Sequence, residues 1–406
     1  MTPLSTSSPV TRTEAAVPPR DWLLLPVLSL LTICGLAVSV EAIARRAFPA
    51  TPATLASCEV RLDRPEGARA IPNSVCWEKL PEGPLTRYAF NRFGDREDVE
   101  RGPKAPGAYR IVMTGTSLAI GRYVPRESTL AALLPAELER RTGRKIDVYN
   151  ESMMQGFPVS TGMRFDEILA AQPDLILWIV VPLDLDYTPE ELYRQEPPPL
   201  PASAGKARSM ERAWYLLKTA YAGDTIAEMV RDHFNRTRTA LMLRHVLYES
   251  QSRYVESFLK GSQDTEFLRT SPSAEWQKKL EEFDSDANEV ASRAKAAGVP
   301  LVAVLVPNRA QAAMISMGQW PQGYDPYKLR EAIRSTIMRH GGIYIDILPG
   351  FRGIANPERD YYPVDGHPDA HGHALLAALI AKGLTDGAAP ALKAPGEENI
   401  ALGQRR

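Results

Sequence analysis

Residues 361–373 read YYPVDGHPDAHGH, and the interpretation of the whole chain depends on this stretch. Asp365 and His367 are separated by one glycine and are followed at once by Pro-Asp and a helical pattern. A loop that brings an acid and a histidine to the start of a helix can hold the imidazole in one orientation. Such a pair indicates a nucleophile elsewhere in the chain, and the best candidate is Ser117, far upstream.

Length and composition limit the class of protein. The chain has 406 residues, enough for one large domain with appendages or for two domains. Its 48 basic and 49 acidic side chains give a formal net charge of −1, which provides no electrostatic basis for nucleic acid as a partner. An apolar content of 44% predicts a substantial hydrophobic core.

The N-terminal region predicts a membrane anchor. Residues 1–20 are rich in Ser, Thr and Pro and are expected to be disordered. Trp22–Val40 contains no charged residue and approaches the ~20 residues that span a bilayer, so we predict an anchor over residues 21–44. A signal peptide cleaved near Ala44 is the alternative. Flanking arginines do not settle the orientation, and we expect the large C-terminal part to be extracytoplasmic, in the periplasm.

Residues 45–105 are interpreted as a connector that carries Cys58 and Cys76. These two cysteines would form a disulfide in an oxidising compartment, and two free thiols are the alternative. No C-x-x-C pattern occurs, which disfavours a zinc site. No cofactor is expected.

From residue 106 onward, apolar strands alternate with helical patterns. Strands are expected at the five segments 110–113, 146–150, 175–181, 301–306 and 343–347. Residues 175–181 are continuously apolar, as in a strand buried on both faces of a parallel sheet. The pattern predicts an α/β fold with three α/β/α layers and a five-stranded parallel sheet. Ligands bind at the carboxyl ends of such strands, so the polar residues that follow the strands should converge.

Two further segments lie outside this alternation. Residues 188–285 are mostly helical and charged and are interpreted as a helical insertion, either a lid or a solvated appendage. The sheet domain would then comprise residues 106–187 and 286–386, and residues 387–406 would form a disordered tail.

Four blocks of the chain resemble the SGNH, or GDSL-like, hydrolase superfamily. They are Gly115-Thr116-Ser117-Leu118, the run from Asn150 to Gly156, the segment from Pro173 to Asp184, and the segment 365–373. The resemblance implies a flavodoxin-like SGNH fold, with Ser117 as nucleophile, His367 as general base and Asp365 as the acid that orients it. It also implies that the backbone N–H groups of Ser117 and Gly156 face a developing oxyanion.

The chain departs from the family pattern at two positions. Thr116 replaces an Asp that is not catalytic. Leu183 replaces the Asn whose side chain completes the oxyanion hole, and losing such a donor can cost about 10²–10³ in rate. Polar residues that could replace it or contact substrate are Asn150, Ser152, Asp184, Asn308 and Arg309.

The other histidines of the last block have alternative roles. His373 is the runner-up base, although a local packing role fits it better. A metal site formed by His367, His371, His373 and Asp365 lacks a helical i, i+4 pair and is not expected.

The resulting hypothesis is a membrane-anchored serine ester hydrolase or O-acyltransferase that acts through an acyl-enzyme on Ser117. Its substrate would be an ester. The family resemblance and a membrane segment at residues 22–40 suggest an acylated carbohydrate of the cell envelope. The alternative is a catalytically degenerate SGNH-like domain that binds a glycan or a protein partner. Leu183 favours the alternative, and the intact set of Ser117, Asp365 and His367 opposes it.

Overall fold

The computed structural model describes most of the chain apart from its ends and one long internal segment. The described residues are 20–49, 55–61, 68–96, 100, 102–154, 157–186, 231, 233–261 and 265–393.

A five-stranded parallel sheet forms the centre of the molecule, as predicted. The strands run in the order β6-β5-β7-β8-β9, the 2-1-3-4-5 order of flavodoxin-like folds. All residues of β5, β7 and β8 are buried, because their continuous apolar sequences are covered on both faces. The strand bounds are β5 Tyr109–Thr114, β6 Ile146–Asn150, β7 Leu175–Val180, β8 Leu301–Leu305 and β9 Ile343–Ile345.

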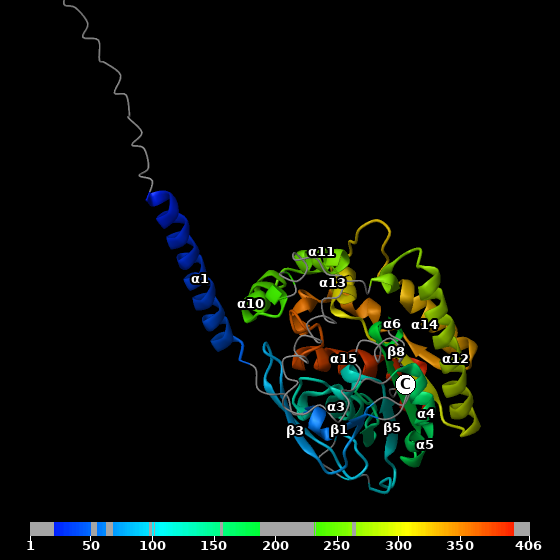
Figure 1. Ribbon diagram of the computed structural model, residues 1–406. Coiled ribbons are helices and arrows are strands. Elements are labelled where there is room, and N and C mark those ends of the chain that lie inside the picture. Colours follow the sequence, from blue (N-terminus) through cyan, green and yellow to red (C-terminus); the bar gives the residue numbers. More distant parts are fainter. Residues whose placement is uncertain are drawn as a thin grey trace, which may run out of the picture.

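Helices cover both faces of this sheet and complete the three layers (Figure 1). Helices α3 (Leu130–Thr142) and α15 (Ala370–Gly383) pack together on one face. The other face is covered by α4 (Pro158–Met163), α5 (Phe165–Ala170), α12 (Ala274–Ala296) and α14 (Lys328–Arg339).

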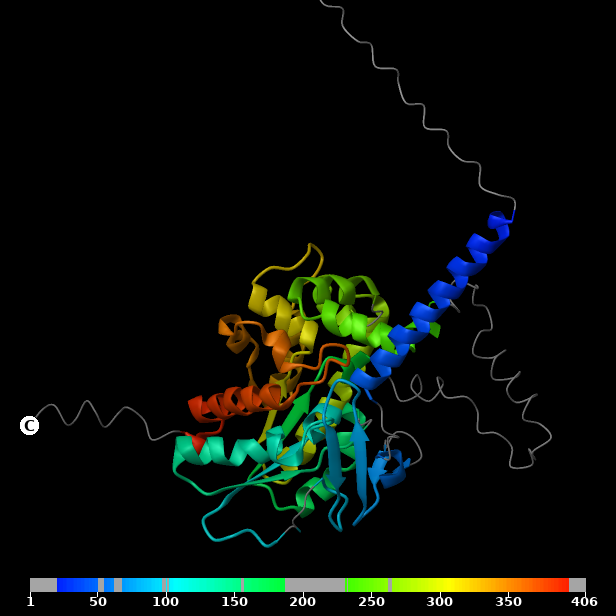
Figure 2. The same cartoon turned by 90° about the vertical axis from the view of Figure 1, so that its left-hand side faces the viewer.

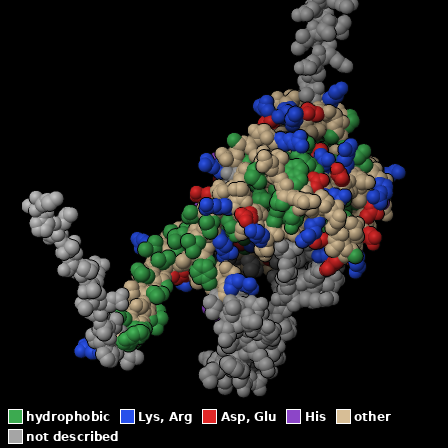
Figure 3. Space-filling model, turned by 90° about the horizontal axis from the view of Figure 1, so that it is seen from above, with side chains coloured by type: hydrophobic (Ala, Val, Ile, Leu, Met, Phe, Trp, Pro, Cys, Tyr) green, Lys and Arg blue, Asp and Glu red, His purple; other side chains and the backbone are tan. Residues whose placement is uncertain are grey.

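Helix α1 (Asp21–Ala47) projects from the body as an arm (Figure 1; Figure 2). Hydrophobic side chains gather along it in the space-filling view (Figure 3). Leu24–Ala47 is long and apolar enough to cross a membrane, and it is the one such helix among the described residues. A signal sequence near an N-terminus would have the same properties.

The predicted connector contains two small antiparallel hairpins. One joins β1 (Glu59–Arg61) to β2 (Ala68–Ala70), and the other joins β3 (Val75–Lys79) to β4 (Leu85–Ala89). Cys58 and Cys76 form a disulfide that ties the two hairpins together.

Two elements cross the predicted domain boundaries. Helix α12 begins at Ala274, inside the predicted insertion at 188–285, because the side chain of Ser273 caps its N-terminus by accepting from Trp276 N–H. Residues 387–393 are not a disordered tail, since they fold back and bury the Leu392 side chain completely.

Part of the predicted insertion is well defined. It forms α10 (Arg238–Leu247) and α11 (Gln251–Gly261), whereas residues 187–230 lie outside the described part of the chain. Of the two predicted tails, residues 1–19 and 394–406 also lie outside it.

Candidate active site

Ser117 lies in a tight turn between β5 and the short helix α2 (Ser117–Ile120). Gly115, just before it, has φ +156°, and a Cβ there would lie 2.7 Å from the carbonyl oxygen of Ile179. Only glycine allows the turn to pass this close to β7. The turn presents the Ser117 side chain at the carboxyl end of the sheet, partly exposed.

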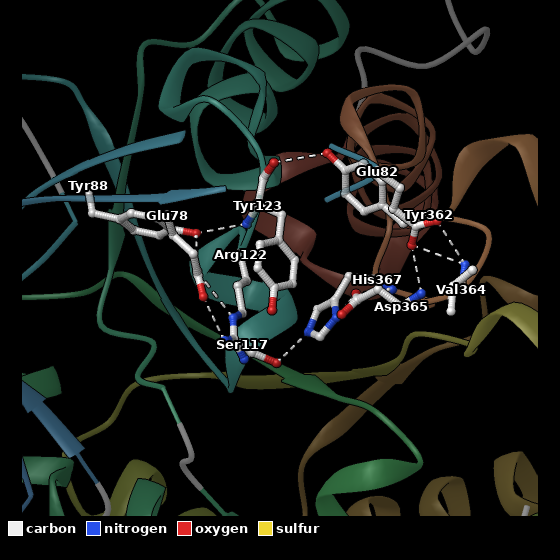
Figure 4. A network of polar contacts seen from close by, with 10 residues as sticks. All are labelled: Glu78, Glu82, Tyr88, Ser117, Arg122, Tyr123, Tyr362, Val364, Asp365 and His367. Carbon is white, nitrogen blue, oxygen red and sulfur yellow. Dashed lines mark hydrogen bonds and ion pairs between the residues drawn. The ribbon is translucent and has the colours of Figure 1, made fainter. Parts of the chain in front are cut away.

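The structure brings Ser117 together with the residues of the last loop (Figure 4). Ser117 Oγ lies 2.9 Å from His367 Nε2, and His367 Nδ1 lies 2.6 Å from Asp365 Oδ1. An ionised carboxylate can only accept, so Nδ1 carries the proton and Nε2 is left to accept from the serine hydroxyl. This is the geometry of an activated serine.

The electrostatics of Asp365 fit this arrangement. Burial raises the pKa of its carboxyl, but hydrogen bonds from the His367 ring and backbone, together with attraction to the charges of His367 and Arg122, outweigh burial, and the net pKa lies below its ordinary value. Asp365 is therefore ionised at neutral pH and favours an imidazolium on His367 when a proton is transferred.

The His367 ring packs against the Tyr123 ring (Figure 4). The two rings meet edge to face, with centroids 5.5 Å apart. Tyr123 has φ +65°, a costly conformation for a tyrosine, and its backbone N–H donates to Tyr88 Oη at 2.8 Å. A strained residue that persists against a functional ring indicates that the surrounding structure holds the ring's position.

A cavity of about 180 Å³ opens in front of Ser117 and His367. Its surface is mainly apolar, and α11 of the insertion supplies Tyr254 and Phe258 to its wall. The insertion thus reaches the site and is more than a solvated appendage. A larger hollow of about 550 Å³, around Trp320 and Tyr327, lies apart from these residues.

Two of the predicted substrate-binding residues do not line the cavity. Asn150 is buried, and its side chain donates to Ala119 O and accepts from Ser152 N–H. Asp184 accepts from Thr116 Oγ1 at 2.7 Å, and burial raises its pKa to about 7. Asp184 therefore supports the turn that carries Ser117, which the sequence motif alone could not reveal.

The other two predicted residues do line the cavity, but both are engaged. The Asn308 side chain caps α13 (Arg309–Met317) by accepting from Gln311 N–H. The Arg309 guanidinium is buried, donates to the carbonyl oxygens of Pro363 and Tyr248, and lies 3.9 Å from the centroid of the Tyr254 ring. It links the insertion to the last loop.

The predicted oxyanion donors are only partly described. Gly156 lies outside the described residues. Ser117 N–H is at the first position of α2, where a helix leaves its N–H groups unpaired. Leu183, at the position of the family's Asn, is 50% exposed and lines the cavity, where its side chain offers no donor.

His373 is a packing residue. It is buried, its Nδ1 accepts from Leu130 N–H, and burial lowers its pKa to about 3. It lies too deep and is too weakly basic to replace His367. Across the described residues, no group of three or more His, Cys, Asp or Glu side chains is arranged to hold a metal ion.

Comparisons with known proteins add little. No family model and no curated protein sequence matches the chain. TesA is 12% identical, and the match covers 68% of this chain and 98% of TesA, with a TM-score of 0.35. A putative GDSL-like lipase from Parabacteroides merdae is 13% identical, with coverage of 68% and 96% and a TM-score of 0.35.

A third similar structure is a mutant of Axe2, an acetyl-xylooligosaccharide esterase from Geobacillus. It is 11% identical, with coverage of 68% and 94% and a TM-score of 0.35. At these TM-scores and identities the likeness says nothing about the activity of this chain, which has to be inferred from its own site.

Proposed function

We propose that the chain is an SGNH-type serine ester hydrolase or O-acyltransferase that works through an acyl-enzyme on Ser117. The single observation that carries this proposal is the continuous hydrogen-bonded line from Ser117 Oγ through His367 to Asp365. A serine hydroxyl is a weak nucleophile until a positioned base takes its proton, and an imidazole is an effective base when an acid holds its tautomer.

The reaction follows from this line. Ser117 Oγ attacks the ester carbonyl as its proton passes to His367 Nε2, and Asp365 stabilises the imidazolium. The carbonyl oxygen becomes an oxyanion that Ser117 N–H stabilises. His367 then donates the proton to the leaving alkoxide, which departs as an alcohol. Water or a second alcohol attacks the acyl-enzyme by the reverse sequence and restores Ser117.

The size of the cavity supports a small acyl group. At about 180 Å³ it is smaller than the ~300–1,000 Å³ pockets that enclose drug-sized ligands. Its apolar wall, with Tyr254, Phe258 and Leu183, suits a short alkyl chain of the acyl group. An O-acylated carbohydrate is the substrate class we favour, with the sugar outside the cavity.

The alternative is a degenerate domain that binds a glycan or a protein partner. Leu183 favours it, because the cavity lacks the donor that the family supplies at this position. The fully assembled set of Ser117, His367 and Asp365 favours an enzyme, since a binding domain has no need for an activated serine.

We further propose that α1 anchors the domain in a membrane, with the domain in the periplasm. The Cys58–Cys76 disulfide suits an oxidising compartment. Helix α10 packs against α1, and its exposed Leu243, Val246 and Leu247 lie at i, i+3 and i+4, on one helix face. Such a helix is suited to the bilayer surface.

Hydrolysis of p-nitrophenyl esters by the full chain in detergent tests the enzyme proposal. We expect acetate and butyrate esters to be cleaved faster than the dodecanoate, with Ser117→Ala inactive. No cleavage of any ester and no transfer to an added sugar, by correctly folded protein, would favour the binding domain. Extraction of the full chain into buffer without detergent would contradict the anchor.

A further inference from the structure

Glu82 lies in the turn between β3 and β4, far in sequence from the last loop, yet its carboxylate contacts that loop directly (Figure 4). Glu82 Oε1 accepts from Asp365 N–H at 2.8 Å and from Val364 N–H at 3.1 Å. The Glu82 side chain is 1% exposed. A buried carboxylate is costly unless donors surround it, so this contact is specific.

These two hydrogen bonds act on the backbone of the acid itself. Asp365 orients His367, and its own N–H is held by Glu82. Because the loop must turn sharply at Gly366, with φ +85°, a small shift at Val364 or Asp365 would rotate the carboxylate away from His367. Hydrogen bonds to an ionised acceptor are shorter and stronger than neutral ones, which suits a positioning role.

The turn that carries Glu82 is held by a hydrogen bond and packs against the last loop. Lys79 Nζ donates to Gly83 O at 2.8 Å across the turn, and a Cβ on Gly83 would lie 3.1 Å from the Tyr362 ring. Glu78, on the same hairpin, pairs with Arg122, the residue before Tyr123. The hairpin therefore supports His367 indirectly in two ways. Glu82 holds the backbone of Asp365, and Glu78 holds Arg122, next to the Tyr123 that packs on the imidazole.

Glu82 also receives a contact from the helical insertion. His245 Nδ1 of α10 lies 2.9 Å from Glu82 Oε2, and Phe48 packs edge-on against the His245 ring. At the start of α10, Thr239 N–H donates to Glu41 Oε2 of α1 at 2.9 Å. Glu82 is thus the point where the arm and α10 meet the loop that carries Asp365.

We propose that Glu82 is a positioning residue that holds Asp365 in register with His367. The role rests on the proposed function, because it concerns the same triad. Glu82 touches neither Ser117 nor the cavity, and it acts through the backbone of the last loop. The reaction therefore depends on a hairpin that lies outside the sheet domain.

The test compares wild type with Glu82→Gln and Glu82→Asp. Glutamine keeps the size but places an amide against two N–H donors, whereas aspartate keeps the charge on a shorter side chain. Inactivation by a fluorophosphonate is resolved into the binding constant and the maximal rate of inactivation. We expect Glu82→Gln to lower the maximal rate about 10- to 100-fold, with Glu82→Asp intermediate and the binding constant little changed.

Glu127→Gln, the same change at an exposed carboxylate, is the matched control and should react like wild type. The downfield proton resonance of the His367–Asp365 hydrogen bond, assigned by its loss in His367→Ala, gives a readout that does not depend on activity. It should shift or broaden in Glu82→Gln variants whose far-ultraviolet circular dichroism matches wild type.

A wild-type rate and an unchanged resonance in Glu82→Gln would overturn the proposal. A lower rate with an unchanged resonance would also overturn it, since the loss would then arise elsewhere. If wild type itself does not react with the probe, the enzyme function fails, and the resonance alone still decides whether Glu82 positions Asp365.

Discussion

Replacing Arg309 should destabilise the site rather than weaken substrate binding. The guanidinium joins α13 to the last loop and to the helical insertion. It donates to Pro363 O in the loop and to Tyr248 O before α11, and it stacks on the Tyr254 ring of α11. Lysine keeps the charge but cannot present a planar fork to two carbonyl groups. Methionine keeps the volume and removes every donor.

The magnitude follows from these contacts. Each hydrogen bond from a charged group contributes about 1.5–3 kcal/mol, and a desolvated cation–π contact contributes about 2 kcal/mol. Because such terms are not additive, we expect Arg309→Met to lower the free energy of unfolding by about 3–5 kcal/mol and Arg309→Lys by about 1–3 kcal/mol. Pro363 is two residues from Asp365, so the maximal turnover rate should fall in both variants.

Urea unfolding measures the first effect, and ester hydrolysis with separate kcat and KM measures the second. Hydrogen exchange of residues 361–367 should rise in both variants. Unchanged stability together with a raised KM would refute this reasoning, because that result would mean that Arg309 contacts the substrate.

Three further predictions concern other parts of the site. Burial raises the folded-state pKa of Asp184 to about 7, so between about pH 4 and 7 the folded state keeps a proton that the unfolded state loses. The free energy of unfolding should therefore fall as pH rises through this window, by at most about 4 kcal/mol. Asp184→Asn should remove this part of the pH dependence, measured by urea unfolding at several pH values. Replacing Cys58 and Cys76 by serine should cost about 3 kcal/mol, measured by thermal unfolding, and should lower the ester hydrolysis rate because Cys76 belongs to the hairpin that carries Glu82. Leu183→Asn should raise kcat about 10-fold or more if the amide reaches the oxyanion, and an unchanged kcat would show that another donor already acts there.

The parts of the fold that could be predicted depend on local signals. Strand β7 is a continuous apolar run, and its burial on both faces follows from that run alone. Asp365 and His367 are close in sequence, so their contact is a local property of one loop. The approach of Ser117 to that loop follows because both lie at the carboxyl edge of the same sheet.

The parts that could not be predicted depend on long-range packing. Glu82 and Tyr123 belong to no motif, and their contacts with the last loop exist only after the hairpin packs against the domain. Asp184 and Arg309 were correctly placed near the ends of strands, but sequence gives no side-chain direction, and both face the backbone or a neighbouring turn. The burial of Leu392 arises entirely from tertiary contacts, so the local sequence predicts only a disordered tail there.

The proposed function requires that Ser117 be a nucleophile activated by His367. Reaction of the full chain with a fluorophosphonate, followed by peptide mass spectrometry, tests it most directly. We predict one phosphonylated residue, Ser117, and loss of labelling in Ser117→Ala and His367→Ala variants that remain folded. A folded wild-type protein that stays unlabelled, or that carries the label at another residue, would contradict the claim.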